Sequence, residues 1–297
     1  MNINIKRFNL VFGRIFAAYE QRSGIYATHD ADTFGPQRLD RPKGTEIGDS
    51  KHLYWLTLAG LSDRRTDSSS LYPRMATMFD QHPELFIQGQ YPTFVELETL
   101  YRTYKIGVPV NDIGLFIKRK RHLDEFFAGD PLRIYDECTT ATEVVVKMRA
   151  LARKHNLPHV FPGAKEKMFS LLAMFLSEIT DLRFSDLVPI DTWVQSVVAS
   201  TGVLRGTESI KVSALEKMLR PPMTRLFSTF RDVPGAANAT WIHGRKLCDR
   251  CGSTDMSKLC PVYDLCKGPF ARMRHAETDR HIGRIAAQPK FRQKAGK

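Results

Sequence analysis

The sequence lacks any uncharged apolar run of the roughly 18 residues that a membrane-spanning helix needs, so no membrane partner is expected. Its N-terminal stretch, residues 1–19, carries Lys6, Arg7 and Arg14 where a signal peptide has an uninterrupted apolar centre. We therefore expect an intracellular protein of the cytoplasm and nucleoid or of the nucleus. The chain also lacks an alternating strand pattern and an internal repeat, which predicts an all-α fold.

Acidic residues are the scarcer charge. The 297 residues include 32 Asp and Glu against 44 Lys and Arg, a net charge of +12. A hydrophobic share of 42% and a charged share of 26% exclude a collagen-like, low-complexity or wholly disordered chain. The excess positive charge favours a polyanionic partner such as nucleic acid. It continues into a basic tail, residues 267–297, with nine Lys or Arg and two Asp or Glu.

Cysteine is also scarce, with five residues in all. Cys138 stands alone and is expected to be an ordinary buried thiol. The other four are crowded into 19 residues, which in an intracellular chain indicates a metal or cluster site. None of the nine His lies in an H-E-x-x-H motif, so His52, His243 and His275 are assigned no role. The predicted metal ligands are Cys248, Cys251, Cys260 and Cys266, which suit a [4Fe–4S] cluster or a structural zinc ion.

Apolar residues recur at helical spacing along most of the chain. Thr140 and Glu143 form a capping-box pattern that marks one helix start. Besides one helix within residues 1–19, the pattern predicts helices near 50–60, 71–78, 93–104, 112–127, 140–155, 166–179, 192–200, 210–220 and 222–231.

Two short segments carry candidate chemistry. Residues 161–167, Phe-Pro-Gly-Ala-Lys-Glu-Lys, form a Gly-containing turn that leads into a helix, where free backbone N–H groups suit a phosphate. Asp191 falls at a predicted helix start, where a carboxylate caps the free amides. Taken alone, residues 161–167 are typical of an ordinary turn with two solvated lysines. Asp191 alone is typical of an ordinary helix cap.

Together, the hairpin lysine and the later Val-Pro-Ile-Asp191 sequence resemble the helix-hairpin-helix DNA glycosylases, the superfamily of endonuclease III and 8-oxoguanine glycosylase. The family hairpin reads L-P-G-V-G-x-K. Residues 58–62, followed by Thr66 and Asp67, resemble the family's L-L-S-x-Q-x-x-D segment, and residues 113–123 resemble its I-G-x-x-x-x-K-A segment. A four-cysteine loop follows the aspartate, as in the endonuclease III branch. The resemblance covers residues 50–270.

The resemblance implies base-excision chemistry on DNA. Lys167 matches the family lysine, whose amine attacks the sugar C1′, displaces the base and allows strand cleavage through a Schiff base. Asp191 matches the family aspartate that assists this attack. The partner is double-stranded DNA with a damaged, mismatched or modified base flipped from the helix, and the protein acts as a monomer. The implied DNA contacts are Gly163, Lys165, Arg64, Arg65, Lys118 and Arg119.

The sequence also departs from the family pattern. Lys165 replaces the second hairpin Gly, and Arg64 or Arg65 stands where relatives have a Gln that fills the space of the flipped base. Only the last interval of the family's C-x6-C-x2-C-x5-C motif matches the spacing here, Cys-x2-Cys-x8-Cys-x5-Cys.

The resemblance predicts two helical domains with a helix-hairpin-helix motif and a DNA-binding cleft between them. Residues 45–167 form a helical barrel domain that ends in the hairpin. Residues 1–44 and 168–297 form the second domain, with the cysteine loop and the basic tail. Two alternatives remain open: a monofunctional glycosylase in which Asp191 activates water, and a non-catalytic, metal-stabilised DNA-binding protein.

Overall fold

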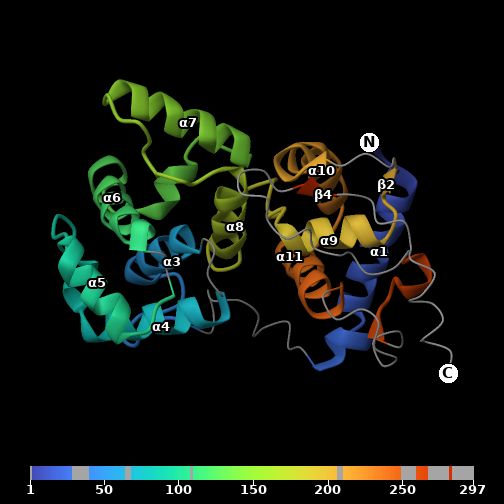
Figure 1. Cartoon of the computed structure of the whole chain (residues 1–297), viewed down its shortest axis with the longest axis horizontal. Coiled ribbons are helices and arrows are strands. Elements are labelled where there is room, and N and C mark those ends of the chain that lie inside the picture. The colour runs from blue at the N-terminus through green and yellow to red at the C-terminus, as the bar shows by residue number, and fades with distance from the viewer. Residues whose placement is uncertain are drawn as a thin grey trace. The chain divides into compact units, whose positions relative to one another are not determined.

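The computed structural model describes residues 2–28, 40–63, 68–107, 110–205, 210–248, 259–266 and 281–282. Within these residues the chain is mostly helical, with ten α-helices and four strands of two residues each (Figure 1). The predicted helical class is therefore confirmed. The strands form two antiparallel pairs, β1 with β2 and β3 with β4. In this described part of the chain, no helix is long and apolar enough to cross a membrane.

The chain divides into two compact units, which we call the central unit, residues 33–189, and the terminal unit, residues 1–32 with 190–297. The central unit was predicted to span residues 45–167, whereas in the structure it spans residues 33–189. The second boundary moves because the helix after the hairpin packs through Phe169, Leu172 and Leu176 into the core of the central unit. The predicted cleft and the metal centre of the second domain stay predictions.

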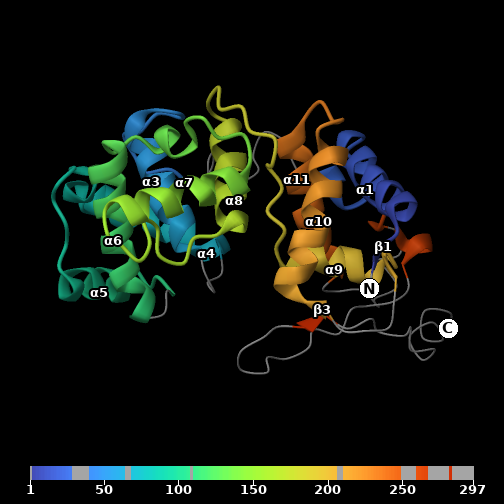
Figure 2. The same ribbon diagram turned by 90° about the horizontal axis from the view of Figure 1, so that it is seen from above.

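The central unit is built around one buried helix, α3 (Ser50–Ser62), whose residues from His52 to Ser62 are all buried. A helix that is apolar on every side belongs inside a helical core, and α3 contacts the helices α4, α6 and α8 (Figure 2). At Gly60 the approach is close, since an added Cβ would lie 2.4 Å from Leu172 Cδ2. The other helices of this unit are α4 (Ser68–Gln81), α5 (Phe94–Thr103), α6 (Val110–Phe127), α7 (Ala141–Lys154) and α8 (Glu166–Ser177).

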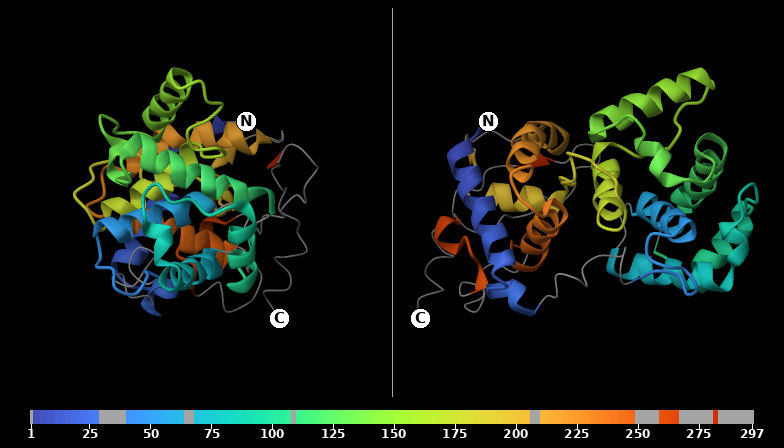
Figure 3. Two further views of the ribbon diagram at one scale, coloured as in Figure 1. Left: turned by 90° about the vertical axis from the view of Figure 1, so that its left-hand side faces the viewer. Right: turned by 180° about the vertical axis from the view of Figure 1, so that it is seen from behind.

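The terminal unit is built around α11 (Val233–Ile242), which the sequence analysis did not predict. Its small residues from Gly235 to Thr240 are buried, so neighbouring helices can approach closely. The N-terminal helix α1 runs alongside it (Figure 3), and α9 and α10 also contact it. The remaining elements are α1 (Ile5–Glu20), α9 (Thr192–Ser200), α10 (Val212–Phe227), the π-helical turn η5 (His243–Leu247), the 3-10 turns η1 (Gly24–Thr28) and η7 (Tyr263–Leu265), and the strands β1 (Asn2–Ile3), β2 (Leu204–Arg205), β3 (Ile210–Lys211) and β4 (His281–Ile282).

One helix replaces the two that were predicted at 210–220 and 222–231. α10 runs through Pro221 and Pro222, which the sequence analysis treated as a break. Leu215, Leu219, Met223 and Phe227 recur every fourth residue and are all buried. This continuous apolar stripe packs into the core on both sides of the prolines, so tertiary packing outweighs the local helix-breaking tendency.

Candidate functional site

The predicted hairpin lies between α7 and α8, two helices that pack against each other. α7 begins with the predicted capping box, in which the Thr140 hydroxyl accepts from Glu143 N at 3.3 Å and Thr140 N donates to the Glu143 carboxylate at 3.0 Å. In the turn, Gly163 has a φ of +79°, a conformation that favours glycine. The amide of Ala164 closes the turn by donating to the Phe161 carbonyl at 3.1 Å.

The start of α8 leaves amide groups for an outside partner. Lys165 is the N-cap residue, its backbone is extended, and its side chain makes no capping hydrogen bond. Gly163 and Lys165 are exposed, and Lys167 is half-buried in the first turn of α8. Uncapped helix-start amides beside two lysines favour an anion. Gly163, Lys165 and Lys167 thus lie together at this turn and helix start, and their predicted roles stay predictions.

α6 braces this hairpin turn from inside the protein. The Arg119 guanidinium donates to the Pro162 carbonyl oxygen from Nη2 at 2.6 Å and from Nε at 3.2 Å. One helical turn further on, His122 Nδ1 donates to the Val160 carbonyl oxygen. Arg119 is 1% exposed, so its predicted role as a DNA contact is wrong. Its charge instead fixes the backbone of the turn that carries Gly163.

The basic run at 118–121 is divided by the helix into inward and outward residues. Lys118 and Arg121 are exposed, whereas Lys120 is fully buried. The Lys120 ammonium donates to the Ile87 carbonyl at 2.8 Å and lies 3.3 Å from the Asp124 carboxylate. Burial lowers the pKa of Lys120, and the Asp124 carboxylate opposes that shift. Lys118 therefore remains available as a DNA contact, while Arg64 and Arg65 lie outside the described residues.

Asp191 caps α9 in the terminal unit, as predicted. Its Oδ1 accepts from the backbone N–H groups of Trp193 at 2.9 Å and Val194 at 3.0 Å. These two bonds orient the carboxylate at the start of the helix. Asp191 and Lys167 belong to different units.

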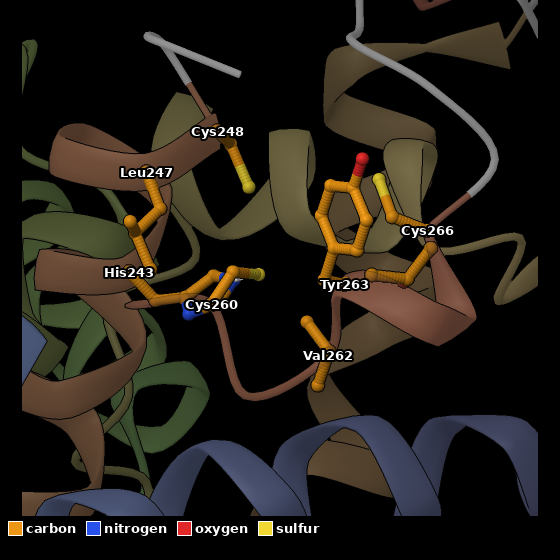
Figure 4. Close-up of a pocket in the computed structure, with 8 residues that line it drawn as sticks. His243, Leu247, Cys248, Cys260, Val262, Tyr263 and Cys266 are labelled. Carbon is orange, nitrogen blue, oxygen red and sulfur yellow. Dashed lines mark hydrogen bonds between the residues drawn. The ribbon is translucent and has the colours of Figure 1, made fainter. Parts of the chain in front are cut away.

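Three of the four predicted cysteine ligands line one small cavity in the terminal unit (Figure 4). Cys248 follows the η5 turn, and Cys260 and Cys266 flank η7. The sulfurs of Cys248 and Cys260 point into the space between these two segments. Cys251 lies outside the described residues. The lining is completed by Thr201, His243, Leu247, Val262 and Tyr263.

The N-terminal part of the chain holds the segment that carries Cys260 and Cys266. Arg14 of α1 donates to both carboxylate oxygens of Asp264, at 2.7 and 2.8 Å. Arg7 donates to the Leu265 carbonyl oxygen. At Gly24, with φ +59°, an added Cβ would lie 2.5 Å from the Leu259 carbonyl oxygen, so this close approach requires glycine. The loop is thus fixed by residues more than 230 positions away in sequence.

The donor set at this cavity suits a thiophilic metal or cluster. Thiolates are the ligands of structural zinc and of iron–sulfur clusters. Burial raises the pKa of Cys260 to about 11, so metal binding would displace its proton. Among the described residues, no three His, Cys, Asp or Glu side chains lie close enough together to hold a single metal ion.

His243 is a residue of this cavity that the sequence analysis left without a role. It is 0% exposed, and burial lowers its pKa to about 3, so the ring is neutral at pH 7. Its Nε2 lies 3.9 Å from Cys260 Sγ. No spacing motif marks this residue, because only the folding of η5 beside the 259–266 segment brings the two side chains together.

Comparison with protein-family models, with curated proteins and with solved structures finds no match. The residues themselves therefore carry any functional assignment. In the central unit these are the hairpin residues Gly163, Lys165 and Lys167, and in the terminal unit they are Asp191 and the cysteine cavity.

We expect the change Arg119→Met to lower the free energy of unfolding by about 1–3 kcal/mol, because the Pro162 carbonyl loses both guanidinium donors. Lys118→Met is the matched control. It removes the same charge at an exposed position one residue away, and it should change the free energy by no more than about 0.5 kcal/mol. Urea denaturation followed by circular dichroism measures both. An equal decrease in the free energy of unfolding in the two variants would contradict the proposed role of Arg119 in holding the hairpin turn.

Proposed function

We propose that the protein is a base-excision DNA glycosylase with AP-lyase activity. The observation that carries the proposal is the hairpin between α7 and α8, held by buried Arg119, with Lys167 in the first turn of its second helix. This arrangement supports the helix-hairpin-helix motif that the resemblance implies. Asp191 at the start of α9 and the cysteine cavity of the terminal unit correspond to the two other features that the resemblance implies.

Lys167 is the proposed nucleophile. Its neutral amine attacks C1′ of the flipped nucleotide, and the bond from C1′ to the base breaks as the new C–N bond forms. The base leaves with the bonding electron pair and takes up a proton. Ring opening then gives a Schiff base between Lys167 and the sugar. Loss of a proton from C2′ and departure of the 3′ phosphate complete the strand cleavage.

Asp191 is the proposed electrostatic partner of this step. As the base departs, positive charge develops on the sugar, and a carboxylate stabilises it. The two bonds from Trp193 and Val194 fix the Asp191 carboxylate before substrate arrives, so no reorientation is needed during the reaction. Such preorganisation is the general source of electrostatic catalysis.

The DNA backbone is the proposed partner of the hairpin. The exposed turn at Gly163 offers backbone amides, and Lys165 and Lys118 offer charge at exposed positions. Arg64 and Arg65 stay proposed contacts to the site of the flipped base. The net charge of +12 suits a duplex, whose phosphates dominate protein–DNA affinity. The protein is proposed to act as an intracellular monomer on a damaged, mismatched or modified base.

A [4Fe–4S] cluster is the proposed occupant of the cysteine cavity, with Cys248, Cys251, Cys260 and Cys266 as its ligands. A tetrahedral zinc ion with ligands at about 2.3 Å requires its sulfurs to lie about 3.8 Å apart. In a four-iron cluster each thiolate binds its own iron, so the sulfurs line a wider space. Three of the four cysteines share one cavity, and the resemblance to the endonuclease III branch favours the cluster. Its proposed role is to hold the loop in place.

The nucleophile is tested on a duplex with one abasic site, which does not depend on the identity of the excised base. Wild-type protein should form a covalent adduct with this duplex in the presence of borohydride, because borohydride reduces the Schiff base. Lys167→Ala and Lys167→Arg should both reduce trapping to background. Arginine keeps the charge but its guanidinium is not a nucleophile at neutral pH, so it separates the chemistry from phosphate binding. The adduct is measured by denaturing gel electrophoresis.

Trapping that is equal in wild type and Lys167→Arg would eliminate Lys167 as the nucleophile. If the wild type releases bases from a lesion panel but neither traps nor nicks, the monofunctional alternative with Asp191-activated water is supported. Tight duplex binding without base release over the same panel supports the non-catalytic alternative.

Asp191→Asn should slow base release or nicking by about 100-fold or more while leaving stability unchanged. Asparagine caps a helix about as well as aspartate, but it has no charge. The matched control is Asp232→Asn at the start of α11, where Oδ1 accepts from Gly235 N at 2.8 Å. This control removes the same charge from the same kind of cap and should retain the wild-type rate. Single-turnover kinetics and thermal denaturation measure the two effects, and equal rates in both variants would exclude the catalytic role.

The metal centre is tested by Cys260→Ser, which should lose the bound metal because the proposed thiolate ligand is replaced by a hydroxyl. Cys138→Ser is the matched control, since Cys138 is buried in the central unit, and it should keep the metal. Elemental analysis of wild type should find about four irons per chain, with broad visible absorption. A colourless protein with about one zinc ion per chain would instead support the structural zinc site.

A further inference from the structure

The fold places one imidazole against one cysteine of the cavity. His243 opens the π-helical turn η5, a kind of local widening that recurs at functional sites. The next residue, Gly244, packs on α9 so closely that an added Cβ would lie 2.4 Å from the Trp193 carbonyl oxygen. This contact fixes the backbone beside His243. The ring is fully buried and lines the same cavity as Cys248, Cys260 and Cys266 (Figure 4).

The two ring nitrogens of His243 have different surroundings. Nε2 lies 3.9 Å from Cys260 Sγ, within reach of a hydrogen bond to sulfur. Nδ1 is buried and has no hydrogen-bond partner among the described residues. A neutral imidazole carries one N–H group, and the other nitrogen is an acceptor. The tautomer with the proton on Nε2 therefore directs the one donor of the ring at Cys260.

We propose that His243 is a positioning residue of the metal centre, which donates an Nε2–H hydrogen bond to the Cys260 thiolate when metal is bound. The inference rests on the proposed metal centre and adds a residue that the cysteine spacing does not identify. Hydrogen bonds to the ligand atoms orient them and tune the metal, and they set the reduction potential of iron–sulfur clusters. Because a donor directed at sulfur stabilises the more negative state, it raises this potential.

A second polar side chain lies beside a cysteine sulfur on another side of the cavity. The Ser200 hydroxyl, which donates to the Ser196 carbonyl oxygen, lies 3.8 Å from Cys248 Sγ. Ser200 lies in α9, whereas His243 lies in η5, so polar side chains from two elements lie beside two different cysteines.

The test compares metal release and reduction potential in four proteins: wild type, His243→Leu, His243→Gln and His52→Leu. Leucine removes the donor, and glutamine keeps an N–H group. His52 is the matched control because it is an equally buried histidine of the central unit. Release of metal to a chelator should be about 10-fold or more faster in His243→Leu, with a lower reduction potential. His243→Gln should fall between His243→Leu and wild type, and His52→Leu should match wild type in both properties.

Unchanged release and potential in His243→Leu would overturn the inference while leaving the metal centre intact. A metal-free wild-type protein would overturn the metal centre and this inference together. Pulsed electron paramagnetic resonance of reduced wild type labelled with 15N-histidine provides a test that needs no variant. Weak coupling to one imidazole nitrogen is expected, and no coupling, or the strong coupling of a direct ligand, would overturn the inference.

Discussion

The contact between the Arg119 guanidinium and the Pro162 carbonyl is the interaction on which the candidate site most depends. A guanidinium is rarely buried without partners, because removing a charge from water is costly. Here it is nearly inaccessible, and two of its N–H groups bind one backbone oxygen of the hairpin. That bond, with the one from His122, ties the turn to α6. The exposed residues of the turn and Lys167 then rest on a rigid support, which a reacting group needs.

In the terminal unit, the described part of the cysteine loop has little regular structure of its own, apart from the short turn η7. Contacts with residues far away in the sequence hold this loop in place. Arg7 and Arg14 of α1 hold the 264–265 backbone and carboxylate, and Gly24 lets η1 approach Leu259. Ser200 of α9 and His243 of η5 lie 3.8 and 3.9 Å from cysteine sulfurs of the cavity. A metal centre at this point would join elements from both ends of the chain, and its binding energy would add to the stability of the unit.

Much of the helical framework could be predicted because its signals are local. The capping box at Thr140 and Glu143, the cap at Asp191 and the glycine turn at 163 involve residues a few positions apart. The errors have a shared cause in long-range packing. α10 continues through Pro221 and Pro222 because its apolar stripe is buried on both sides of them. α11 was missed because its Gly, Ala and Asn residues show little hydrophobic periodicity. These small residues instead allow neighbouring helices to pack closely against α11.

By itself, the sequence determined the helical class, most helix starts and ends, the hairpin turn with its two lysines, and the crowding of four cysteines. All of these follow from interactions within a few residues or from composition. Only the tertiary structure decided which way each charged or polar side chain faces. In the run at 118–121, the two outer cations are exposed and the two inner ones are buried, according to what α6 packs against. His243 likewise meets Cys260 across 17 residues of sequence. No local rule encodes such contacts, because burial depends on surfaces supplied by distant segments.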